Sequence, residues 1–93
     1  MQKTKTTVKI AGKDYNIAGY DTEEYVRHVA ACVDRRMNEL SLATHLPPAQ
    51  LAVLTAVNAV DDMLKSREAL RRLRMENERL ILLMESKNND TLA

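Results

Sequence analysis

The chain has 93 residues, enough for one small domain and too few for two. It contains three Tyr, no Phe and no Trp, and a core without large aromatic rings is hard to fill at this size, so we expect a second copy of the chain to complete it. Hydrophobic residues make up 45% and charged residues 29%, which excludes a disordered chain. No apolar run approaches the roughly 20 residues of a membrane span, and the N-terminal segment lacks the apolar stretch of a secretory signal. We therefore expect neither.

The charges are nearly balanced, with a net charge of +1. Residues 1–20 carry four Lys against one Asp (+3), residues 21–46 three Arg against five acids (−2), and residues 47–93 seven of each sign (0). This distribution is not the clustered basic charge of a nucleic-acid-binding protein. Cys32 is the single cysteine, which excludes an internal disulfide, in practice excludes a zinc cluster, and fits a reducing cytoplasm.

The first segment predicts a β-hairpin. Thr6–Ile10 and Asp14–Ile17 alternate polar and apolar residues, as half-buried strands do. A two-residue type II′ turn at Gly12–Lys13 is expected between them, because glycine tolerates the positive φ at its first position. This register pairs Ile10 with Tyr15 and Val8 with Ile17 on one apolar face, and Lys13 points elsewhere.

A helix is predicted next. Asp21 is a good N-cap, and Glu24 three residues later completes a capping box. Helix 1 is expected to end near Leu42. Its apolar side chains recur at helical spacing and form one buried stripe: Val26, Val29, Ala30, Val33, Met37 and Leu40.

A long helix is predicted from Pro48, which suits the first turn because proline lacks an N–H. No Gly or Pro follows it, so residues 48 to about 86 run for about 58 Å at 1.5 Å per residue. The fold class is α+β, with an N-terminal β-hairpin, a short amphipathic helix and a long C-terminal helix forming a coiled-coil stalk. We expect a head at residues 1–64, the stalk at 65–86 and a flexible tail at 87–93.

The long helix carries two predicted oligomer contacts. In its first half, apolar residues spaced by three or four are expected to lie under helix 1 and the hairpin and against a partner subunit. Its second half is a short heptad with Asn77 at a core position, where an Asn costs stability but can fix register and strand number. The apolar run 81–84 widens this seam beyond two helices, so we expect an intertwined dimer and a dimer of dimers. The interface residues are Leu51, Leu54, Val57, Asn58, Leu64, Leu70, Leu73, Asn77, Leu80 and Met84; Asn58 is expected to be a buried amide.

No catalytic arrangement is found. His28 and His45 have no neighbouring acid and nucleophile, and Cys32 is interpreted as a half-buried filler. Asp61 and Asp62 point about 100° apart on a helix and cannot chelate one ion together. The sequence therefore predicts a chain that is not an enzyme, with no cofactor, no metal and no small-molecule substrate.

Basic residues gather in two places. The long helix carries arginines ahead of and within the heptad, a layout similar to a basic zipper, but glutamates interleave with them. A solvated, salt-bridged face, including Asp61–Lys65 and Glu68–Arg72 pairs, is the favoured interpretation, and DNA binding is the alternative. The hairpin lysines either protect a strand edge from aggregation or dock an acidic partner: Lys3, Lys5, Lys9 and Lys13.

The order of these parts resembles the ZapA family of bacterial cell-division proteins. The resemblance rests on the turn Ile10-Ala11-Gly12-Lys13, the capped helix opening Glu23-Glu24-Tyr25-Val26-Arg27, and above all the stretch Leu51 to Leu64. It covers residues 6 to about 85. The chain departs mildly from the family pattern at Val57, where Leu is common, and at Asp62-Met63, where Glu-Leu is frequent.

The resemblance implies a role rather than a reaction. Proteins of this family are cytoplasmic, act at mid-cell, bind the tubulin-like GTPase FtsZ, and bundle its filaments as dimers and tetramers. The contact surface lies on the head and uses charged residues, so Lys13, Arg27, Arg35 and Arg36 are the candidate FtsZ-binding residues. The alternatives are a coiled-coil scaffold for another partner and a small dimeric DNA-binding protein.

Overall fold

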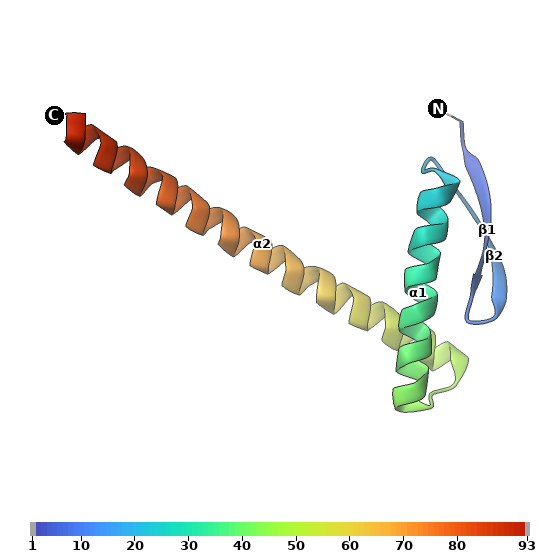
Figure 1. Ribbon diagram of the computed structural model, residues 1–93. Helices are drawn as coiled ribbons and strands as arrows, with labels where there is room; N and C mark the ends of the chain where they lie inside the picture. The colour runs from blue at the N-terminus through green and yellow to red at the C-terminus, as the bar shows by residue number, and fades with distance from the viewer. Residues whose placement is uncertain (1, 93) are drawn as a thin grey trace. The chain divides into compact units, whose positions relative to one another are not determined.

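The structure is a computed structural model that describes the backbone of residues 2–92 and the side chains of residues 2–87. It contains an antiparallel hairpin of β1 (Thr4–Ile10) and β2 (Lys13–Gly19), followed by α1 (Glu23–Thr44) and α2 (Pro48–Leu92) (Figure 1). This confirms the predicted fold of a hairpin and two helices, the second of them long. Two compact units are present, the first reaching to Val57 and the second beginning at Asn58.

The hairpin differs from the predicted one in its turn. Ile10 pairs with Lys13 and Val8 with Tyr15, so the two turn residues are Ala11 and Gly12, with φ of 51° and 80°. Positive φ at both central residues defines a type I′ turn, which matches the twist of the strands. The predicted Gly12–Lys13 turn and its register are therefore wrong. The shift is by two residues, so the apolar face survives, but Lys13 now shares that face.

The start of α1 also differs. Thr22, not Asp21, is the N-cap: its backbone is extended and its hydroxyl accepts a hydrogen bond from the Tyr25 N–H at 3.2 Å. The carbonyl of Asp21 instead accepts a hydrogen bond from the Thr4 hydroxyl at 2.8 Å, which ties the chain leaving the hairpin back to β1. The predicted capping box with Glu24 is therefore wrong, because that side chain lies one position too early.

The end of α1 lies two residues beyond the expected one. His45 adopts a left-handed conformation, with φ of 56°, and its N–H bonds the Ser41 carbonyl at 2.8 Å to close the helix. Pro48 then opens α2, as predicted. The backbone of α2 continues to Leu92 without a break near residue 86. The head, stalk and tail boundaries stay predictions, and the side chains of 88–93 lie outside the described residues.

The core lies entirely in the first unit. β1 packs against α1, and the side chains of Val8, Ala30 and Met37 are buried between these elements. Leu51 and Thr55 bring the first turns of α2 into the same core, at 7% and 6% exposure. Within the second unit no described side chain is buried.

Candidate functional site

A groove of about 590 Å³ lies beside the hairpin tip in the first unit. The hairpin, the C-terminal half of α1 and the first turn of α2 form its walls. Among the described residues that line it, Lys13 is the only charged one. The full lining is Ala11, Lys13, Tyr15, Met37, Asn38, Ser41, Leu46, Pro48, Ala49, Leu51 and Ala52. A groove lined mostly by apolar residues, with one cation among them, fits an apolar side chain that is flanked by a carboxylate.

Lys13 is placed there by the hairpin turn. It is the first residue of β2, it is exposed, and it shares a face with Tyr15 because the two lie two residues apart on the strand. Its ammonium makes no hydrogen bond or ion pair with any residue whose side chain is described. The ammonium is therefore available to an acidic partner.

The three candidate arginines do not gather around Lys13. Arg27 is held by Glu23 on its own helix, with 3.3 Å between the guanidinium Nη2 and Oε2. Arg36 follows Arg27 by nine residues, which turns the helix by about 180° and sets these two on opposite sides of α1. Arg35 is exposed, whereas Arg36 is half-buried. Of the four predicted contact residues, the groove includes Lys13 alone.

Sequence reasoning missed the polar residues that share the groove with Lys13. Asn38 and Ser41 line it from α1, and Tyr15 lines it from β2. The sequence could have indicated Tyr15, because it lies two residues after Lys13 on the same strand and therefore shares its face. Asn38 and Ser41 are spaced by three, which places them on one side of a helix, but the sequence did not indicate that this side meets the hairpin tip.

The predicted interface residues of α2 fall into two groups. Leu51 is buried in its own chain, and Leu54 and Asn58 are half-buried. The others are exposed: Val57 60%, Leu64 55%, Leu70 47%, Leu73 67%, Leu80 48% and Met84 65%, and also Asn77. Exposed apolar side chains that recur along a helix mark a surface for another chain.

These exposed side chains occupy two different faces of α2. Val57, Val60 and Leu64 follow one another at spacings of three and four, and so form one stripe. Leu73 lies nine residues after Leu64, which is about 180° around the helix. The stripe of the heptad, which includes Leu73, is therefore on the side opposite to the first stripe.

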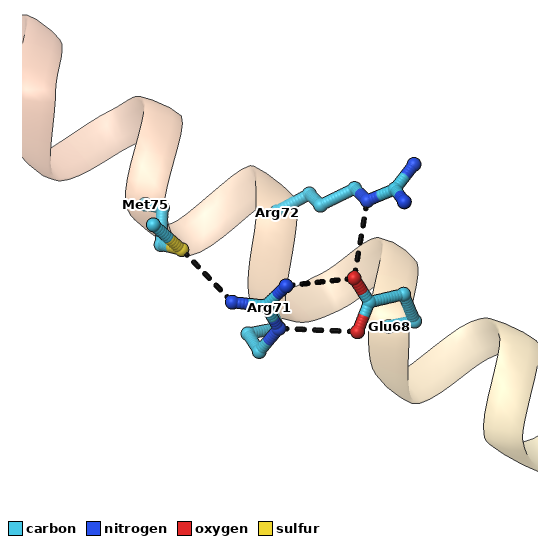
Figure 2. A network of polar contacts seen from close by, with 4 residues as sticks. All are labelled: Glu68, Arg71, Arg72 and Met75. Atoms are coloured by element: carbon cyan, nitrogen blue, oxygen red, sulfur yellow. Dashed lines mark hydrogen bonds and ion pairs between the residues drawn. The ribbon is translucent and has the colours of Figure 1, made fainter.

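Glu68, Arg71, Arg72 and Met75 form a network of polar contacts on the surface of α2 (Figure 2). Arg71 donates two hydrogen bonds to the carboxylate of Glu68, at 2.7 and 3.1 Å, and Arg72 donates a third at 3.1 Å. Arg71 also donates to the sulfur of Met75 at 3.1 Å. The hydrogen bonds from Arg71 hold the pKa of Glu68 below its ordinary value, and Glu68 in turn raises the pKa of Arg71.

The network bears on the two interpretations of the basic residues. The predicted pairs Asp61–Lys65 and Glu68–Arg72 are confirmed, at 2.8 and 3.1 Å. Arg79 is also paired, with Glu76 at 2.8 Å. A cation that is held by a carboxylate on its own helix has less charge to offer phosphates. The salt-bridged face is therefore favoured over a DNA-binding face.

Among the side chains of residues 2–87, no three His, Cys, Asp or Glu residues lie together in an arrangement that could hold a metal ion. His28 Nε2 lies 4.0 Å from the sulfur of Cys32 one helical turn later. In the same described residues, no single helix is both long and apolar enough to span a membrane, although α1 and α2 taken together as one broken span meet that test by length and composition.

Comparison with known proteins identifies the family. The family model described as cell division protein ZapA matches residues 6–90. The cell division protein ZapA of Halalkalibacterium halodurans is 48% identical over 80 residues, covering 85% of this chain and 86% of the relative. That of Bacillus licheniformis is 49% identical over 74 residues, covering 78% and 87%.

A solved structure shows the same likeness in three dimensions. It is a ZapA mutant dimer from Geobacillus stearothermophilus, 40% identical, with a TM-score of 0.66, covering 84% of this chain and 92% of the solved one. Sequence and fold thus agree over most of the chain and over most of each relative. The chain belongs to the ZapA family of cell division proteins.

Proposed function

We propose that this cell division protein acts without catalysis: it binds FtsZ filaments and crosslinks or bundles them, and so promotes assembly of the division ring during septation. The observation that carries the proposal is the exposure of apolar side chains on two faces of α2. A bundling protein must hold at least two filament-binding heads in one particle. Two apolar faces on one helix provide two ways to join copies of the chain.

The first stripe, Val57, Val60 and Leu64, supports a homodimer. The Geobacillus relative was solved as a dimer, and the aromatic-poor core of this chain is confined to the first unit. The opposite stripe, with Leu70, Leu73 and Leu80, supports the pairing of dimers into a homotetramer. Multivalency then strengthens weak individual contacts, because the second head binds at a high effective concentration.

The hairpin tip supports the filament contact. Lys13 is exposed and lines the groove, and no other charged residue lines that groove within the described residues. A carboxylate on FtsZ would pair with the Lys13 ammonium while a neighbouring apolar side chain enters the groove. Arg35, also exposed, adds long-range attraction rather than a second contact at this place. The cytoplasm at mid-cell is the location that this activity requires.

Co-sedimentation with FtsZ polymers tests the proposal. The purified protein is centrifuged with FtsZ in the presence and absence of GTP, and light scattering is followed in parallel. We expect the protein to pellet only when filaments form, with a rise in scattering. A stable oligomer that stays in the supernatant would leave a scaffold for another partner as the better function.

Paired charge reversals locate the contact. Lys13→Glu should abolish most of the pelleting, whereas Lys9→Glu, which makes the same change of charge on the opposite face of the hairpin, should not. Both variants should keep the oligomeric state of the wild type on sedimentation velocity. Equal loss in the two variants would indicate a general effect of charge and no contact at the groove.

A further inference from the structure

The hairpin turn is built from residues that do not favour it. Ala11 and Gly12 are the central residues of a type I′ turn, with φ of 51° and 80°. Glycine adopts this conformation freely, and Asn is the residue preferred before it. Alanine rarely adopts a positive φ, because its Cβ crowds the backbone. A contact from outside the hairpin is therefore needed to hold Ala11.

Asp34 on α1 supplies that contact. Its Oδ1 accepts a hydrogen bond from the backbone N–H of Ala11 at 2.8 Å, across 23 residues of chain. Ile10 and Lys13 close the ladder of the hairpin, so the N–H of Ala11 lies beyond the ladder and has no strand partner. A carboxylate is a strong acceptor for such an N–H, and it ties the turn to the middle of α1.

The position of Lys13 depends on this bond. Lys13 follows Gly12 directly, so the direction in which the chain leaves the turn fixes where its ammonium stands over the groove. We propose that Asp34 is a positioning residue for filament binding, which holds the strained Ala11–Gly12 turn so that Lys13 meets its partner. This inference rests on the proposed function. If the free turn adopts the competent geometry a tenth of the time, apparent affinity falls roughly tenfold.

Three variants test the inference by co-sedimentation with FtsZ polymers. Asp34→Ala removes the acceptor and should weaken binding roughly tenfold. Asp34→Asn keeps a carbonyl oxygen that accepts the same N–H, and should bind close to the wild-type level. The double variant Asp34→Ala/Ala11→Asn should recover binding, because Asn-Gly favours the type I′ turn without help from α1.

The outcomes separate this inference from the proposed function. Wild-type protein that fails to pellet overturns both. If Asp34→Ala pellets as well as the wild type, the inference alone is overturned. It is also overturned if Asp34→Ala and Asp34→Asn bind equally weakly, because that result would mean that the charge of Asp34 matters and not its hydrogen bond. Amide exchange at Ala11 gives a direct readout: the N–H should exchange faster in Asp34→Ala than in Asp34→Asn. Far-UV circular dichroism and sedimentation show which variants fold. If Asp34→Ala does not fold, Asp34→Asn can still be compared with the wild type.

Discussion

Thr6 offers a direct test of how the core is built. It lies on β1, is only 2% exposed, and its hydroxyl oxygen has no hydrogen-bond partner among the described residues. A buried hydroxyl without a partner costs about 1–3 kcal/mol. Valine has the same branched shape, with a methyl group in place of the hydroxyl, and suits a strand equally well. We therefore predict that Thr6→Val stabilises the protein.

The magnitude follows from two effects that act in the same direction. Thr6→Val removes the desolvation cost of the hydroxyl and buries one more apolar group, worth about 0.8 kcal/mol. Since native contacts relax and the unfolded chain is partly compact, we expect a net gain of about 1–2 kcal/mol. In a chain of this size, 1 kcal/mol raises Tm by about 4–8 °C.

Thr55→Val is the matched control. Thr55 is also buried, at 6% exposure, but its hydroxyl donates to the Leu51 carbonyl at 2.7 Å. Its replacement loses a hydrogen bond worth about 1 kcal/mol while burying one more methyl, so its Tm should change little. Thermal unfolding followed by circular dichroism measures the Tm of both variants. The protomer concentration is kept fixed, because association shifts the apparent stability. An unchanged or lowered Tm for Thr6→Val would show that the Thr6 hydroxyl is hydrogen-bonded in solution.

Three further predictions concern α2 and the hairpin tip. Arg71 lowers the pKa of Glu68 in the folded chain, so the ion pairs of Glu68 stabilise the helix above the pKa that Glu68 has in the unfolded chain, and this stabilisation is lost as the pH falls through the pKa in the folded chain. Glu68→Gln should therefore reduce helicity at neutral pH and match the wild type in acid, as circular dichroism would show. Leu73→Asp should remove tetramers and leave dimers, whereas Leu64→Asp on the opposite face should disturb the dimer; identical sedimentation profiles would contradict two separate stripes. Filament binding through Lys13 should weaken as salt is raised from about 0.05 to 0.5 M, because screening shortens the reach of exposed charges, and salt-independent pelleting would argue against a charged contact.

Features decided by neighbours in the sequence were predictable. Pro48 opens α2 because its missing N–H is harmless only in a first turn. The pair Asp61–Lys65 forms because four residues along a helix bring two side chains together. Both depend on spacing within one helix, and no distant part of the chain can change them.

The errors arose where distant residues decide. By composition Gly12–Lys13 is the better two-residue turn, because glycine stands where φ is positive, whereas the bond from Ala11 to Asp34, 23 residues away, favours the Ala11–Gly12 turn. Asp21 and Thr22 are both good N-caps, and the bond from Thr4 to the Asp21 carbonyl, 17 residues away, favours the later start. The groove around Lys13 escaped prediction for the same reason, since its walls come from three elements.

In the proposed function, the second unit links binding to assembly. None of its described side chains is buried, so the helix has no core of its own, and packing rather than propensity supplies most helical stability in proteins. The exposed pairs around Glu68 add little, because water and salt screen them. In the proposed assembly, the apolar side chains on its two faces gain their burial from other copies of the chain. We therefore predict that dilution, by separating the copies, removes the support of the helix and the multivalency of the heads together.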